Sequence, residues 1–237
     1  MKPEISLDTG PADTEPTWKQ RAVERSTRAT KQRAEQRVQR FLDAAQELMA
    51  DKGTTDFTVQ EVVDRSGQSL RSFYQHFDGK HELLLALFED ALSRTGDALR
   101  AATSGPGAAE APVARLEAAT RLLFTMCRPG PGDLHPLFSE FAPQLLLTHP
   151  DEVRLAHAPV LGILAELVEG VDAAGGLRPG MRPRRAAAML MQTTMFLSQS
   201  AIGVNSAIGV SPDGPAPRPL TADEVWAFCS GGFGTRT

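Results

Sequence analysis

The sequence is poor in the residues that cross-link small proteins or build sheets. It contains two cysteines in 237 residues, Cys127 and Cys229, which lie far apart and lack the spacing of metal ligands. This usage favours buried, reduced thiols in a cytoplasmic protein over a disulfide framework. Tyrosine occurs once, and no segment shows the alternation of β-branched and polar residues that marks a strand. The predicted fold class is all-α.

Long apolar runs are also missing. No stretch of about eighteen apolar residues could cross a membrane, and no basic, apolar and small-residue signal opens the chain. We therefore expect a soluble, cytoplasmic protein without a membrane partner. Hydrophobic residues make up 41% of the chain, which is ordinary for a soluble protein and enough to build a core.

Motifs of catalysis and cofactor binding do not stand out either. We find no nucleophile–base pair, carboxylate dyad or phosphate-binding loop, so a helical enzyme is only a remote alternative. The histidines at 135, 149 and 157 do not share a helical face at i, i+4 spacing, so no metal site is predicted. No cofactor is expected.

What the chain does have is a segregated positive charge. Residues 17–40 hold eight basic and two acidic side chains, a net charge of +6, while the whole chain carries −4 and the remainder therefore −10. Such a basic stretch favours a polyanionic partner. The alternative is a solvated tail that only keeps the protein soluble.

The stretch 58–80 contains two short helices with a tight turn between them. Thr58 and Glu61 have the spacing of a capping box, and Gly67 suits the left-handed residue that ends a helix. Ser69 can cap the second helix. Apolar residues keep helical spacing in both: Val59, Val62 and Val63, then Leu70, Phe73 and Phe77. This order is typical of a helix-turn-helix, whose second helix lies in the DNA major groove.

The side chains between these apolar positions can form hydrogen bonds. The string Gly67-x-Ser69-x-x-Ser72-Phe73-Tyr74-x-His76-Phe77-x-x-Lys80 resembles the N-terminal domain of the tetracycline-repressor (TetR) family. In that family an aromatic-Tyr-x-His-Phe run ends the recognition helix, and a Lys opens the next helix. The resemblance implies a dimeric repressor that binds an inverted-repeat operator in double-stranded DNA and is released by a small molecule.

Ten residues are candidates for contact with DNA. Thr58 can offer a phosphate its hydroxyl and the free amides of a helix N-terminus. The resemblance assigns contacts with the DNA backbone to Tyr74, His76 and Lys80. Contacts with base edges are expected from residues at or near the exposed N-terminal side of the second helix, which are Gln68, Ser69, Leu70, Arg71, Ser72 and Gln75. Arg71 is the strongest base-reading candidate because a guanidinium pairs bidentately with guanine, although a phosphate contact is the alternative.

The helices on either side define three parts of the chain. Residues 1–32 are expected to be a disordered basic arm that contacts DNA. Residues 33–95 should form the three-helix DNA-binding domain, with the motif at about 58–77 and a core at Leu48, Phe57, Val62, Phe73 and Phe77. A long helix from Lys80 then leads to a larger helical domain, residues 96–237, for effector binding and dimerisation.

One helix of this larger domain, expected over Arg184–Val204, is apolar nearly all round. A helix that is apolar on all sides must be buried on all sides, here between its own subunit and a partner. The resemblance implies that it pairs with a last helix, Thr221–Phe233, in a four-helix dimer interface.

The effector is the least defined part of the prediction. Apolar and methionine side chains suit an adaptable pocket but equally a packed core. The candidates for pocket lining are Phe124, Met126, Phe138, Phe141, Leu145, Met189, Gln192, Met195, Phe196 and Trp226. The scarcity of charge in the segment 189–204 favours an apolar or acyl-type effector. A regulator that needs no effector, senses a protein partner or activates transcription is the alternative.

Overall fold

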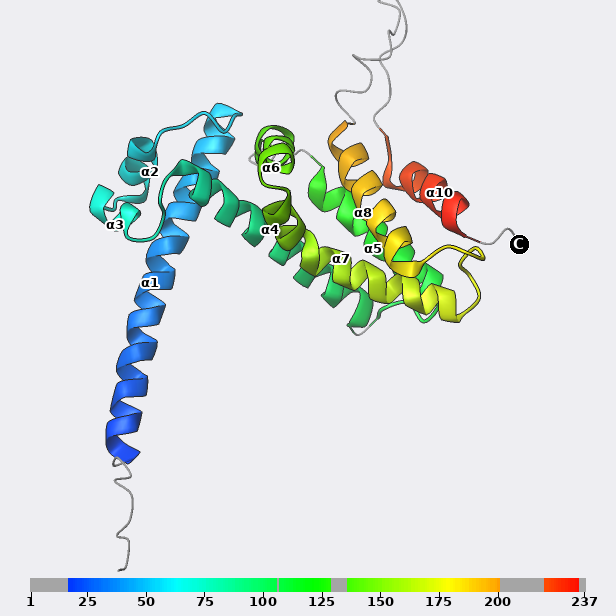
Figure 1. Cartoon of the computed structure of the whole chain (residues 1–237), viewed down its shortest axis with the longest axis horizontal. Coiled ribbons are helices and arrows are strands. Elements are labelled where there is room, and N and C mark those ends of the chain that lie inside the picture. Colours follow the sequence, from blue (N-terminus) through cyan, green and yellow to red (C-terminus); the bar gives the residue numbers. More distant parts are fainter. Residues whose placement is uncertain (1–16, 106, 129–135, 201–219, 235–237) are drawn as a thin grey trace, which may run out of the picture.

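The computed structural model describes residues 17–105, 107–128, 136–200 and 220–234. In these ranges every regular element is a helix, and the one bridge between extended residues joins Leu177 to Gly234. The elements are α1 Thr17–Lys52, α2 Val59–Ser66, α3 Leu70–Tyr74, α4 Lys80–Ser104, α5 Pro112–Cys127, the π-helix η1 Leu137–Phe141, α6 Ala142–Thr148, α7 Pro150–Ala173, α8 Pro183–Ser200 and α10 Ala222–Phe233 (Figure 1). The all-α prediction is confirmed.

The first three helices form a small unit of their own. The second half of α1 packs on α2, and α2 on α3 (Figure 1). All five predicted core residues of this unit are buried: Leu48, Phe57, Val62, Phe73 and Phe77. Gly53 ends α1, since it has a φ of 67° and its N–H donates to the carbonyl of Met49.

The start of α1 differs from the sequence-based expectation. Residues 17–32 were expected to be disordered, but they continue α1, which is 36 residues long. No glycine or proline interrupts this segment, and its Ala, Arg, Lys and Gln residues have high helix propensity. Extending a helix from a packed end costs no new nucleation. An apolar stripe is therefore not needed for helicity here. Residues 1–16 lie outside the described residues.

The larger unit is a bundle built on α4. Helix α4 runs out of the three-helix unit and packs against α5 and α7, while α8 packs on α5 and α7, and α10 covers α5 and α8 (Figure 1). The expected domain boundary after residue 95 falls inside α4. The two units therefore share a continuous helix and no flexible linker separates them.

Prolines mark the starts of the helices in this unit. Pro112, Pro150 and Pro183 open α5, α7 and α8, where the missing proline N–H costs nothing. Between α5 and α7, the π-helix η1 is followed directly by α6. The Ala142 N–H donates to the Leu137 carbonyl, five residues back. Pro143 next to it can neither donate a hydrogen bond nor leave room for the carbonyl four residues earlier, which accounts for the widened turn.

Helix α8 is only partly covered by its own subunit. Ala187, Leu190 and Thr194 are buried against the bundle, but Met189 is 60% exposed and Phe196 is 68% exposed. The inner face is therefore buried as expected, whereas burial of the outer face against a partner subunit stays a prediction, because the described residues of the single chain leave that face uncovered. Residues 201–204 of the expected helix lie outside the described residues.

The two units are also joined by a carboxylate. One oxygen of Glu140 in η1 accepts hydrogen bonds from the Thr54 hydroxyl at 2.9 Å, the Thr55 N–H at 2.9 Å and the Thr55 hydroxyl at 3.0 Å. Thr54 and Thr55 lie in the connection between α1 and α2. Charge-assisted hydrogen bonds are among the stronger ones in proteins. The connection is therefore fixed to the larger unit.

Both cysteines are free and buried, as the sequence suggested. Burial raises the pKa of the Cys127 thiol to about 12, so this thiol is protonated and unreactive at neutral pH. None of the described helices combines the length and the apolar character needed to cross a bilayer.

Candidate DNA-binding surface

Capping interactions define both helices of the motif. The Thr58 hydroxyl accepts a hydrogen bond from the Glu61 N–H at 3.2 Å, and the Glu61 carboxylate accepts one from the Thr58 N–H at 2.8 Å, which completes a capping box. Gly67 ends α2 with a φ of 65°. Ser69 caps α3 by accepting from the Ser72 N–H at 3.1 Å. These features confirm the helix-turn-helix predicted from the sequence.

Helix α3 is held by aromatic packing from below. The Phe73 ring lies 5.4 Å from that of Phe41 and 5.4 Å from that of Phe77, and the Phe41 and Phe77 rings are 6.1 Å apart. Helix α3 ends at Tyr74, and Phe77 lies in the connection between α3 and α4. Phe41 belongs to α1, so α3 is oriented directly by that helix.

The surface above this cluster carries most of the predicted DNA contacts. The structure brings them together on α3 and the residues next to it. Six are exposed to solvent: Thr58, Ser69, Leu70, Arg71, Tyr74 and Gln75. Four are half-buried: Gln68, Ser72, His76 and Lys80.

Three of the half-buried side chains have surroundings that the sequence did not predict. The Gln68 side-chain amide donates to the carbonyl of Arg37 in α1 at 2.9 Å. The Lys80 ammonium donates to the Thr55 carbonyl at 3.3 Å and lies 5.5 Å from the centre of the Phe57 ring. Its two other N–H groups remain for a phosphate. Nε2 of His76 is buried without a hydrogen-bond partner in the described part of the chain.

Comparison with known proteins matches this region of the chain. Residues 41–87 match the family described as bacterial regulatory proteins, tetR family. The HTH-type transcriptional regulator SrpR of Pseudomonas putida is 37% identical over 60 residues, which is 25% of this chain and 28% of that protein. Residues 41–87 therefore form a domain of the tetR family type. An uncharacterized HTH-type regulator, YvdT of Bacillus subtilis, is 28% identical over 69 residues, 29% of this chain and 36% of that protein.

The sequence match to these relatives spans only about a third of their length, whereas the similarity in fold to solved structures covers more than four fifths of this chain. FadR of Bacillus halodurans, a fatty acid degradation regulator, aligns with a TM-score of 0.64 at 18% identity, covering 83% of this chain and 95% of that one. SmeT, the repressor of a Stenotrophomonas maltophilia efflux pump, gives a TM-score of 0.57 at 19% identity, covering 84% and 90%. These relatives and structural neighbours are transcriptional regulators, not enzymes.

The ten candidates for a ligand pocket differ in their exposure to solvent. Phe124, Phe141, Leu145, Met195 and Trp226 are buried in the packed core. Phe138 is partly buried, with its ring 5.6 Å from that of Phe88. The other four face solvent: Met126, Met189, Gln192 and Phe196. For the buried ones, packing in the core explains the side chain without a ligand.

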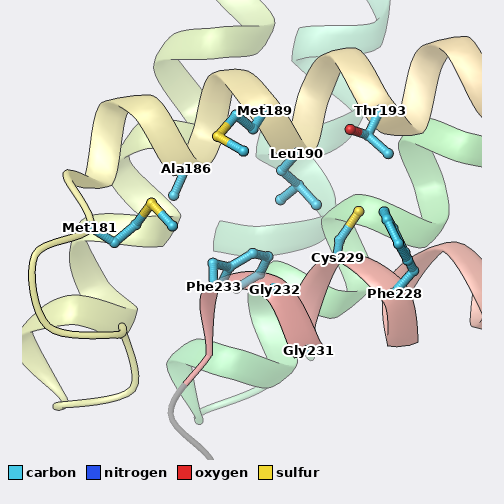
Figure 2. A pocket seen from close by; sticks show the side chains of 10 residues that line it. All are labelled: Met181, Ala186, Met189, Leu190, Thr193, Phe228, Cys229, Gly231, Gly232 and Phe233. Carbon is cyan, nitrogen blue, oxygen red and sulfur yellow. The ribbon is translucent and has the colours of Figure 1, made fainter.

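One hollow opens on the outer face of the larger unit, between α8 and α10 (Figure 2). It has a volume of about 410 Å³, and Met189 is the only pocket candidate among its lining residues. Figure 2 shows Met181 and Met189 on one side and Phe228 and Phe233 on the other. Its walls are apolar, and it opens to solvent.

Several residues that position the motif escaped the sequence reasoning. The Arg65 guanidinium in α2 pairs with Asp51 at 2.8 Å and Glu47 at 3.3 Å, both in α1. The Lys52 ammonium at the end of α1 lies 2.7 Å from the Glu61 carboxylate. These partners are separated by nine or more residues across a bend. No local spacing rule reveals them.

Glu61 makes the start of α2 sensitive to acid. The hydrogen bond from Lys52, followed by those from Thr58, lowers the pKa of the Glu61 carboxyl from 4.5 to about 2. Because the folded pKa is depressed, this stabilisation is complete above pH 4.5 and is lost as the pH falls towards 2. We expect Glu61→Gln to lower the Tm at pH 7 and to differ progressively less from the unsubstituted chain as the solution is acidified.

Thermal unfolding followed by circular dichroism between pH 7 and pH 3 tests this expectation. Glu169→Gln, an exposed carboxylate on α7, is the matched control and should give the same Tm as the unsubstituted chain across this range. A Tm difference for Glu61→Gln that stays constant with pH would contradict the assignment.

Proposed function

We propose that this protein is a cytoplasmic, dimeric transcriptional regulator that binds an inverted-repeat operator and acts as a repressor. The observation that carries the proposal is the α3 surface, where Arg71, Tyr74 and Gln75 are exposed above a rigid aromatic cluster. Side chains on a fixed helix can be matched to base edges because their positions vary little. Two such helices on a two-fold axis would read half-sites one helical turn apart.

The basic first half of α1 supports a polyanionic partner. Arg28, Lys31, Arg33, Arg37 and Arg40 are all exposed along this helix. An α-helix is about 10–12 Å across, while the minor groove of B-DNA is about 6 Å wide. Residues 17–32 therefore cannot enter the minor groove as the expected arm would. We propose that they contact phosphates along the DNA backbone instead, which contributes affinity but no sequence preference.

Arg71 is the residue we assign to base reading. Arg71→Ala should cost about 1–3 kcal/mol of binding free energy and relax the preference at one operator position. Binding to the inverted repeat upstream of the gene, and to versions with each base pair changed in turn, measures both effects by fluorescence anisotropy. Arg154→Ala, an exposed arginine on α7, should leave binding unchanged. An equal loss on every sequence would assign Arg71 to a phosphate.

The outer face of α8 and α10 supports a dimer. Met189 and Phe196 are exposed on α8, and Phe228 on α10 is 72% exposed. Large apolar side chains gathered around an open apolar hollow are unusual on the surface of a monomer. A second copy of the chain, related by a two-fold axis, would bury each face against its equivalent and fill both hollows. This arrangement also provides the partner that the apolar character of α8 requires.

Phe228→Asp should therefore convert the dimer to a monomer, because a carboxylate would be buried in an apolar contact without a partner. Size-exclusion chromatography with light scattering measures the mass at several protein concentrations. Leu147→Asp places the same charge at an 85% exposed apolar position on α6 and should leave the dimer intact. A monomeric unsubstituted chain, or a dimeric Phe228→Asp chain, would argue against this interface.

For the effector we propose an apolar or acyl-type molecule. Two observations support it. The first is that the bundle interior is almost wholly apolar. The second is that FadR of Bacillus subtilis was solved in complex with stearoyl-CoA; its fold matches with a TM-score of 0.62 at 17% identity, over 82% of this chain and 98% of that one.

The proposal of an apolar or acyl-type effector is tested by measuring the Tm of the protein, in buffer with EDTA, in the presence of free fatty acids, acyl-CoA thioesters and apolar drugs. A ligand that binds the folded state should raise the Tm by several degrees at about 100 times its Kd and reduce operator binding. A Tm that no compound raises would favour the effector-independent alternative. Operator binding by the free protein is measured separately, so that failure of the effector proposal leaves DNA binding testable.

A further inference from the structure

The first turns of α4 and α7 bring together three side chains that are distant in the sequence. A ring nitrogen of His81, a ring nitrogen of His149 and a carboxylate oxygen of Glu152 all lie within 4.8 Å of one another. His81 is the second residue of α4, His149 precedes α7, and Glu152 is in its first turn. From this geometry we infer a site for a divalent transition-metal ion of the Zn²⁺ class.

The distances suit such an ion. Zn²⁺ binds imidazole nitrogen and carboxylate oxygen at about 2.0–2.2 Å in a tetrahedron, which places neighbouring ligand atoms about 3.4 Å apart. Nε2 of His81 and Oε2 of Glu152 are already 3.6 Å apart. Both histidine rings are exposed, so they can rotate to close the remaining gap. Three protein ligands leave the fourth position for water.

Hydrogen bonds around His149 prepare its ring for a metal. The Thr148 hydroxyl donates to the Gln144 carbonyl at 3.0 Å, so its oxygen is left to accept from Nδ1 of His149 at 2.8 Å. This arrangement places the ring proton on Nδ1 and leaves the lone pair on Nε2 free. Metal-binding histidines commonly have the second nitrogen fixed in this way.

Glu152 provides an independent indication. Its Oε2 is buried and accepts no hydrogen bond from the described residues, and Nε2 of His81 lies 3.6 Å away. A buried carboxylate oxygen without a hydrogen bond is costly unless a cation neutralises it. Two imidazoles with one carboxylate suit Zn²⁺, Co²⁺ or Ni²⁺ and do not suit Mg²⁺ or Ca²⁺, which prefer oxygen ligands.

The site lies where α4 leaves the three-helix unit, next to the connection between α1 and α2. His81 follows directly after Lys80, whose side chain contacts the connection that Glu140 also binds. His149 and Glu152 belong to the larger unit. A metal ion here would fix the start of α4, where this helix leaves the three-helix unit, to the first turn of α7, beside the Glu140 contacts.

The sequence did not predict this site, because histidines were compared only with one another at i, i+4 spacing. His149 and Glu152 are three residues apart at a helix start, and His81 is far away in the chain. Only the packing of α4 against η1 and α7 brings the third ligand to the other two.

Titration of the tag-free full chain with ZnCl₂ in a calorimeter, without DNA, tests the inference. We expect one Zn²⁺ per chain, a higher Tm with Zn²⁺ and no response to MgCl₂. Zn²⁺ affinity should fall by at least about 10–100-fold, the loss typical when a residue that hydrogen-bonds to a metal ligand is removed, in each of the ligand variants His81→Gln, His149→Gln and Glu152→Gln. Thr148→Val removes only the hydroxyl that accepts the hydrogen bond from Nδ1 of His149, and it should weaken Zn²⁺ binding by about 10–100-fold.

Asp151→Asn is the matched control, because Asp151 is an exposed carboxylate next to Glu152 that pairs with Arg154 at 3.1 Å. It should leave Zn²⁺ affinity unchanged. Co²⁺ should give the visible absorption of a tetrahedral site in the unsubstituted chain and in Asp151→Asn, and lose it in Glu152→Gln. Equal affinities of Glu152→Gln and Asp151→Asn, or no saturable Zn²⁺ binding, would overturn the inference.

Discussion

A recognition helix of five residues cannot stabilise itself. Isolated helices shorter than about 12–15 residues are marginal in water, so α3 depends on what it packs against. The Phe41, Phe73 and Phe77 rings, 5.4–6.1 Å apart, provide that support. Because Phe41 belongs to α1 and the Gln68 amide also binds the α1 backbone, α3 keeps one orientation relative to the basic helix. The DNA-facing side chains therefore move as one body with α1.

Because α3 is fixed to α1, a movement of the larger unit that displaces α1 would also displace α3. The α1–α3 body meets the bundle at the start of α4 and at the Thr54–Thr55 connection, and Glu140 holds that connection through three hydrogen bonds. Glu140 lies in a π-helix, an element that appears frequently at functional sites. A ligand that moves η1 must stretch these hydrogen bonds or rotate the α1–α3 body about α4. In the dimer that we propose, either result would change the distance between the two α3 helices.

Interactions between neighbours in the chain could be predicted from the sequence, and those between distant residues could not. The capping boxes at Thr58 and Thr221 and the turn at Gly67 depend on spacings of a few residues, and all are present. The core of the three-helix unit followed from helical periodicity. Glu140 with Thr55, and Lys52 with Glu61, pair across bends that no periodicity describes. The length of α1 was missed because apolar spacing reports packing, and this part of α1 has little.

The ligand side could not be predicted for a related reason. An apolar residue in a helical bundle has the same sequence pattern whether it lines a pocket, fills the core or faces a partner. Phe124, Phe196 and Met189 looked alike in the sequence, yet the first is buried, the second exposed, and the third lines an outward hollow. Polar residues at helix ends are more informative, because a buried carboxylate needs a partner wherever the fold places it. The Glu61 carboxylate pairs with Lys52 at the start of α2, that of Glu140 binds Thr54 and Thr55, and that of Glu152 lies 3.6 Å from the His81 ring at the first turn of α7. These positions are where a change in the bundle would reach α3.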